Sequence, residues 1–123
     1  MRGQISLEYL VLSLVAISLL SLAVFALLNL RDYSASASGT LMFRSSALSL
    51  SNAISETCAL GSGNSRSVLL KAPLSVEYQE QMVRFSGSNL SIVEPSRCEV
   101  EAVEGLEGLV YVENDGGVIT IGK

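Results

Sequence analysis

The feature that most constrains this chain is an apolar run that begins close to its N-terminus. Between Leu10 and Leu30 the only polar residues are three serines and one asparagine, and there is no charge. As a helix these 21 residues would span about 30 Å, the thickness of the hydrocarbon core of a bilayer. Neither Gly nor Pro interrupts the sequence from Gln4 to Ser38. The run therefore predicts a long helix that can cross a membrane, with its serines bonded to carbonyls one turn earlier.

One carboxylate lies just inside the start of this predicted helix. Glu8 follows Gln4 by one helical turn and precedes Tyr9 and the apolar run. A charge within a membrane helix costs roughly 2.5–3.5 kcal/mol on insertion scales, and by default it marks a functional site. The alternative is that Glu8 sits among lipid head groups, where it stabilises the N-terminus of the helix.

The residues around Glu8 match a processing motif. The chain begins Met-Arg-Gly-Gln-Ile-Ser-Leu-Glu-Tyr-Leu. This segment resembles the class III signal peptide of archaeal type IV pilins, in which a basic residue and Gly precede Gln-x-Ser-x-Glu-Tyr and a hydrophobic stretch. The resemblance covers residues 1–30 and implies that a prepilin peptidase cuts between Gly3 and Gln4 on the cytoplasmic side. Residues 1–3 would then be a leader, and the hydrophobic helix would stay with the mature protein.

The same resemblance implies that Gln4, Glu8 and Tyr9 belong to an assembly site. In type IV pilins the glutamate is thought to meet the new N-terminal amine of a neighbouring subunit, which here would be the ammonium of Gln4. Opposite charges attract strongly in an apolar surrounding, and leaving one of them unpaired there is costly. Since Gln4 and Glu8 are one turn apart, a contact between them within one chain is an alternative. The expected partners are other copies of the chain, the prepilin peptidase and assembly machinery, and the membrane before assembly.

The ends of the apolar helix predict its orientation. Two positive groups, Arg2 and the initiator amine, precede the helix, whereas the opposite charges of Arg31 and Asp32 after the helix cancel each other. The positive-inside rule therefore places the N-terminus in the cytoplasm and the rest of the chain outside the cell. We expect a surface filament subunit. Two alternatives are a minor pilin or anchored surface-binding protein with the same leader, and a small secreted domain released after Ala37, where Ala-Ser-Ala resembles a cleavage site.

Residues 4–33 are expected to form the hydrophobic helix, and residues 34–60 its amphipathic continuation. Small residues at 34–39 favour a kink or a softened turn. Beyond them, steps of three and four residues predict one buried stripe made of Phe43, Ala47, Leu50, Ile54 and Cys58. Leu41 and Leu48 fall nearly opposite this stripe, and we expect helices of neighbouring subunits to cover them. Alternatively, they are isolated exposed leucines, which are common.

Residues 61–123 predict a β-rich head. Short strands are expected at 67–71, 75–79, 82–86, 90–93, 99–103, 109–113 and 118–121. Pro73 should break a strand or mark an edge, because proline cannot donate to a ladder. Glu80-Gln81 and the segment from Asn114 to Gly117 are expected hairpin turns. The predicted fold is α+β, with a long N-terminal helix on a small antiparallel sheet.

Composition argues against several functional classes. The net charge is −4, Trp and His are absent, and the basic residues are scattered, so neither nucleic-acid binding nor His-based catalysis is expected. No nucleophile motif or cofactor fingerprint is present, and we expect no enzyme and no cofactor. Seven acidic residues lie between Glu94 and Asp115 but lack EF-hand spacing. A solvated strand face explains them better than a calcium site, and no metal is predicted.

Two further sites are predicted in the head. Cys58 and Cys98 are the only cysteines and belong to no C-x-x-C motif. In an oxidising location outside the cell they should form one disulfide. Asn89-Leu90-Ser91 is an N-glycosylation sequon, a pattern that is also common by chance.

Overall fold

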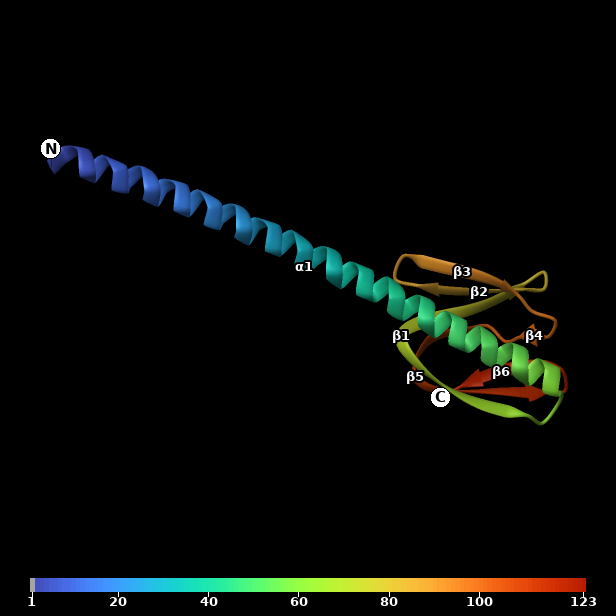
Figure 1. The fold of residues 1–123 in the computed structure, drawn as a ribbon. Helices are drawn as coiled ribbons and strands as arrows, with labels where there is room; N and C mark the ends of the chain where they lie inside the picture. The colour runs from blue at the N-terminus through green and yellow to red at the C-terminus, as the bar shows by residue number, and fades with distance from the viewer. Residues whose placement is uncertain (1) are drawn as a thin grey trace. The chain divides into compact units, whose positions relative to one another are not determined.

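The structure is a computed structural model that describes residues 2–123. These residues contain one helix, α1 (Arg2–Leu60), and a six-stranded sheet, so the predicted α+β fold is confirmed (Figure 1). The strands are β1 (Ser65–Gln79), β2 (Met82–Gly87), β3 (Leu90–Pro95), β4 (Glu99–Val100), β5 (Val103–Asp115) and β6 (Val118–Gly122). Met1, the first residue of the predicted leader, lies outside the described residues.

The chain divides into two compact units at Ala37 and Ser38. The first is purely helical, and its side chains from residue 6 to residue 37 are all exposed. The second unit, called the head below, contains the C-terminal part of α1 and the whole sheet. α1 is assigned without a break across residues 34–39, the segment whose composition favours a kink or softened turn.

The sheet has the strand order β3-β2-β1-β5-β6-β4. All neighbouring strands are antiparallel except β4 and β6, which pair in parallel. Both predicted hairpin turns are confirmed. At the first, Glu80 and Gln81 have φ of 51° and 64°, the left-handed backbone that a two-residue hairpin of the primed type requires. At the second, Gly116 and Gly117 supply that backbone without strain.

The core of the head lies between the C-terminal part of α1 and one face of the sheet. The predicted stripe is confirmed, because Phe43, Ala47, Leu50 and Ile54 are buried and Cys58 is half-buried against them. From the sheet, the residues buried in this core are Leu70, Leu74, Val76, Val83, Phe85, Val100, Leu106, Val110, Val112, Ile119 and Ile121. The inward-facing positions alternate with exposed ones along each strand, as expected for a sheet covered on one face.

Of the two alternatives predicted for Pro73, a strand break and an edge position, the strand break is wrong. β1 runs through Pro73, and its pairing with β5 shifts register between Leu70 and Leu74. Ser46 of α1 is buried at this bulge, where its hydroxyl accepts hydrogen bonds from the N–H groups of Lys71 at 2.9 Å and Ala72 at 3.3 Å. Proline is tolerated at a bulge because no ladder bond is required there.

Replacing Ser46 with Ala should therefore destabilise the head by about 1–3 kcal/mol, because two backbone donors lose their acceptor. Ser45→Ala is the matched control, since Ser45 is the exposed neighbour on the same turn. Urea unfolding of the full chain in detergent would compare the two. Equal stability of both variants would show that the Ser46 hydroxyl does not hold the bulge.

The predicted strand at 99–103 is also wrong in its extent. β4 ends at Val100, and Val103 already belongs to β5. The sheet order explains the division, because β4 lies beyond β6 at the sheet edge while β5 lies between β1 and β6. The chain must leave one position and cross to the other between these residues. The N–H of Glu101 makes the last contact with β6, donating to the carbonyl of Ile119 at 2.9 Å.

Candidate functional site

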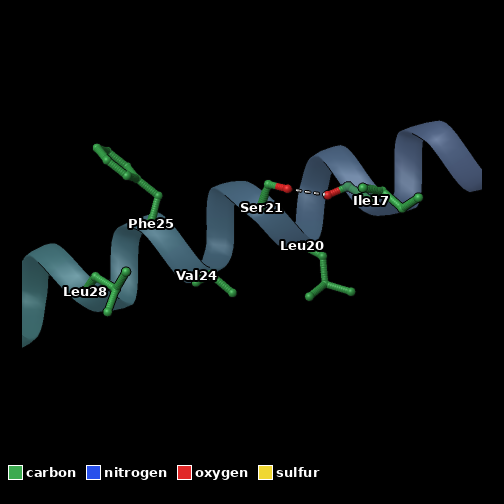
Figure 2. A pocket seen from close by; sticks show the side chains of 6 residues that line it. All are labelled: Ile17, Leu20, Ser21, Val24, Phe25 and Leu28. Carbon is green, nitrogen blue, oxygen red and sulfur yellow. Dashed lines mark hydrogen bonds between the residues drawn. The ribbon is translucent and has the colours of Figure 1, made fainter.

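The candidate site is the apolar surface of the first helical unit. Its large side chains are mostly half to two-thirds exposed, for example Ile17 at 66% and Phe25 at 67%. Figure 2 shows part of this surface, a shallow hollow lined by Ile17, Leu20, Ser21, Val24, Phe25 and Leu28. Burying one large apolar side chain is worth about 1.5–3 kcal/mol. A surface with this many such side chains needs lipid or other apolar helices to cover it.

The length and composition of the helix suit a membrane. The described residues contain one helix long and apolar enough to cross a bilayer, with a window of mean hydropathy 2.8 of which none is buried. The predicted serine contacts are confirmed, since the Ser18 hydroxyl donates to the carbonyl of Leu14 at 2.8 Å. The Ser21 hydroxyl likewise donates to the carbonyl of Ile17 at 2.9 Å (Figure 2). These hydroxyls are satisfied without water, which lowers the cost of placing the helix in an apolar surrounding.

The residues of the predicted assembly site lie at the start of α1. Gln4 and Glu8 are exposed and one turn apart on the helix, and Tyr9 is 70% exposed beside them. Glu8 is the only charged residue in the sequence from Gln4 to Leu30. Its carboxylate therefore lies at the edge of an otherwise uncharged apolar surface. Cleavage between Gly3 and Gln4 and the pairing of Glu8 with an ammonium stay predictions.

The second predicted packing surface lies on the head part of α1. Leu41 and Leu48 are 67% and 40% exposed, whereas Phe43 and Ala47 on the inner stripe are buried. Arg44, which lies between Leu41 and Leu48 in the sequence, is also exposed. These leucines thus lie on the part of the helix that the sheet does not cover, and coverage by a neighbouring subunit stays a prediction.

The predicted disulfide between Cys58 and Cys98 is confirmed. The two Cα atoms are 5.9 Å apart, and the bond links the last turns of α1 to the segment that precedes β4. It closes a loop with a sequence separation of 40 residues. The end of α1 is therefore tied covalently to the sheet that covers it.

A second link between helix and sheet was not predicted from the sequence. Asn114 is buried, and its side-chain amide donates to the carbonyl of Thr57 at 3.1 Å while its side-chain oxygen accepts from the N–H of Gly117 at 2.9 Å. One side chain thus joins the end of α1 to the β5–β6 turn. Asn before Asp-Gly-Gly signals the turn, but the contact with Thr57 spans 57 residues and has no local signal.

The remaining predicted positions lie on the surface of the head. Asn89 is exposed in the tight turn between β2 and β3, where its N–H donates to the carbonyl of Gly87 at 2.6 Å. Glycosylation of Asn89 stays a prediction. Within the described part of the chain, no three His, Cys, Asp or Glu side chains are grouped so that they could hold a metal ion.

No protein-family model, curated protein or solved structure matches this chain. Its function is therefore inferred from the apolar helix, the charge at its start and the disulfide-linked head.

Proposed function

We propose that this chain is a structural subunit of a type IV pilus-like surface filament of the archaeal kind, assembled through its N-terminal helices. The observation that carries the proposal is Glu8, the one charge between Gln4 and Leu30 on an exposed apolar helix, at the fifth position after the predicted cut between Gly3 and Gln4. A plain membrane anchor has no use for a carboxylate at this position, and by default such a charge is functional.

Helix packing provides the energy of the proposed assembly. In lipid the hydrophobic effect does not drive helices together, so association depends on close packing and on polar contacts between helices. Small residues let backbones approach, and Ala16, Ser18 and Ala23 are spread along the helix. Glu8 would add a specific ion pair between subunits, because cleavage creates an ammonium on Gln4 that the Glu8 carboxylate of a neighbouring subunit can pair with.

The head fits a location outside the cell. Disulfides form and persist in oxidising surroundings, and the Cys58–Cys98 bond agrees with a head that has crossed the membrane. The precursor would sit in the cytoplasmic membrane with its N-terminus inside and its head outside. In the filament, Leu41 and Leu48 would pack against helices of neighbouring copies, which continues the apolar contact into the head.

A minor pilin or an anchored surface-binding protein would share the same helix and leader. The abundance of the chain separates these functions, because a principal subunit dominates the protein of sheared surface filaments, whereas a minor one does not. A domain released after Ala37 would discard the Glu8 helix altogether.

We expect the mature protein to begin at Gln4, because the motif places a small residue at the bond and the hydrophobic helix beyond it. Intact mass of the chain from the membrane fraction would measure this. Gly3→Val is the matched control and should accumulate with Met1 retained, since a branched side chain occupies the position before the bond. A wild-type surface protein that retains Met1 would refute the processing, and one beginning at Ser38 would favour a released domain.

A further inference from the structure

A groove of about 710 Å³ lies beside the disulfide, lined by the last turns of α1 and by the segment that joins β3 to β4. From α1 the lining includes Cys58 and Ala59. From the end of β3 and the segment that follows it, the lining includes Pro95, Ser96 and Arg97. Its volume is in the range of sites that hold a small molecule. This hollow, called the disulfide groove below, therefore leaves room for a small reactant next to a covalent bond that can be broken.

The two bonded cysteines are not equivalent toward the disulfide groove. Cys58 belongs to its lining, so a reactant in the groove meets Cys58 first. Cys58 also lies in the last turn of α1, which ends at Leu60. The C-terminus of a helix carries partial negative charge and disfavours a thiolate there, and in thiol–disulfide exchange the sulfur that better bears negative charge leaves faster. Access and charge therefore both select Cys58 as the sulfur attacked and Cys98 as the leaving group.

Arg97 gives the disulfide groove a positive charge. Of the described residues that line the groove, only Arg97 is charged, and its side chain is exposed. The attacking species in exchange is a thiolate, and the net charge of −4 on the chain repels anions. A cation beside the groove raises the local concentration of an anionic reactant. The groove thus favours an anionic thiol over a neutral one.

We propose that the disulfide groove is a site of thiol–disulfide exchange, where the thiolate of a small anionic thiol attacks Cys58 and expels Cys98. A bond forms between the sulfur of the reactant and that of Cys58, the Cys58–Cys98 bond breaks, and its electron pair leaves on Cys98, which takes up a proton. A second thiolate then attacks the reactant's sulfur in this mixed disulfide, so that Cys58 leaves and is protonated in turn. Two electrons thereby pass to the two cysteines from two thiols, which end joined as a disulfide. The same steps in reverse install the Cys58–Cys98 bond.

Contacts other than the disulfide hold both sides of the groove while the bond is open. The N–H of Ser96 donates to the carbonyl of Gln81 at 2.9 Å, and its hydroxyl donates to the carbonyl of Cys98 at 2.8 Å. On the helix, the carbonyl of Thr57 accepts from the side-chain amide of Asn114 at 3.1 Å. Exchange can therefore proceed in the folded head and reverse there. This chemistry does not depend on the proposed function; only its setting outside the cell does.

The test uses the oxidised full chain in non-ionic detergent with excess reduced glutathione, an anionic thiol. Acid quenching and alkylation preserve the mixed disulfide, and trypsin separates the two cysteines by cutting after Arg66 and Arg97. Early in the reaction, glutathione should be at least about tenfold more abundant on Cys58 than on Cys98. The rate should change by less than about twofold in urea below the unfolding transition, whereas exchange through the unfolded chain would rise exponentially with urea.

The charge of Arg97 is tested separately. Arg97→Glu should slow exchange with glutathione about tenfold, because the anion then meets a negative charge in place of a positive one. Exchange with cysteamine, whose thiolate form carries a compensating ammonium, should change by less than about twofold. Arg84→Glu is the matched control, since it makes the same charge change at an exposed position of β2, and both rates should stay within about twofold of the wild type.

Several results would overturn the proposal. Glutathione found mainly on Cys98 would do so, as would reduction that occurs only as the chain unfolds. Arg97→Glu protein that reacts with glutathione at the wild-type rate would also contradict it, and equal slowing toward glutathione and cysteamine would indicate a structural effect instead. Because these measurements follow isolated chains, failure of the proposed function would leave them unaffected, and failure of the exchange would not prevent filaments.

Discussion

A chain with Glu8 replaced by Gln should be cleaved after Gly3, remain in the membrane and form no filaments. Gln keeps the size and helix propensity of Glu and removes only its charge. Insertion should persist or improve, because a neutral amide is cheaper to bury than a carboxylate. The ammonium on Gln4 of a neighbouring subunit would then be buried without a counter-charge. Breaking a buried ion pair in this way typically costs about 3–5 kcal/mol, repeated for each subunit added.

The alternative role of Glu8 predicts a much smaller effect. If the carboxylate only stabilises the N-terminus of the helix, its loss should cost less than about 1 kcal/mol, and filaments should still form. Electron microscopy of the cell surface distinguishes these outcomes, provided that intact mass shows normal processing of the variant. Glu8→Asp, which keeps the charge, is the matched control and should retain some filaments. Normal filaments from correctly processed Glu8→Gln protein would rule out the pairing role.

Removing the Cys58–Cys98 disulfide should destabilise the head by about 4 kcal/mol in the chain-entropy treatment, since the bond closes a loop with a separation of 40 residues. A head of this size has a small core, so the loss is a large part of its stability. The measurement is urea unfolding of the full chain in detergent, with pulse proteolysis as the readout. It compares the wild type with the double variant that carries both Cys58→Ser and Cys98→Ser.

Reduced wild-type protein is the control for this experiment. Both sulfurs are then present without their bond, so its stability should lie close to that of the double variant. Oxidised and reduced wild-type protein with the same midpoint would contradict a stabilising role for the disulfide. A double variant much less stable than the reduced wild type would instead indicate that the packing of the half-buried sulfur atoms matters more than the cross-link.

Local patterns in the sequence were sufficient to predict the helix and much of the head. The spacing of Phe43, Leu50 and Ile54 predicts their burial, because residues three and four apart share one face of a helix. Cys58 lies on the same stripe and therefore faces the sheet, where it forms the disulfide with Cys98. The hairpin at Glu80 and Gln81 was predicted from its flanking strands, although neither residue is a typical turn former at positive φ.

Features that depend on distant contacts were not predictable in this way. Pro73 stays within β1 because Ser46, 25 residues from Lys71 in sequence, satisfies the bulge. The division of residues 99–103 follows from the position of β4 beyond β6, which no local pattern encodes. Likewise, the pairing of Leu69 with Leu109 follows from the register of β1 with β5, which no local pattern encodes.

The most direct test of a processed, helix-assembled filament subunit is the intact mass of the principal protein in filaments sheared from the cell surface. We expect the mass of a chain that begins at Gln4 and contains the Cys58–Cys98 disulfide, with any glycan on Asn89 as a discrete addition. Filaments that lack this chain, together with a chain found only in whole membranes from Met1 or in the medium from Ser38, would contradict the account.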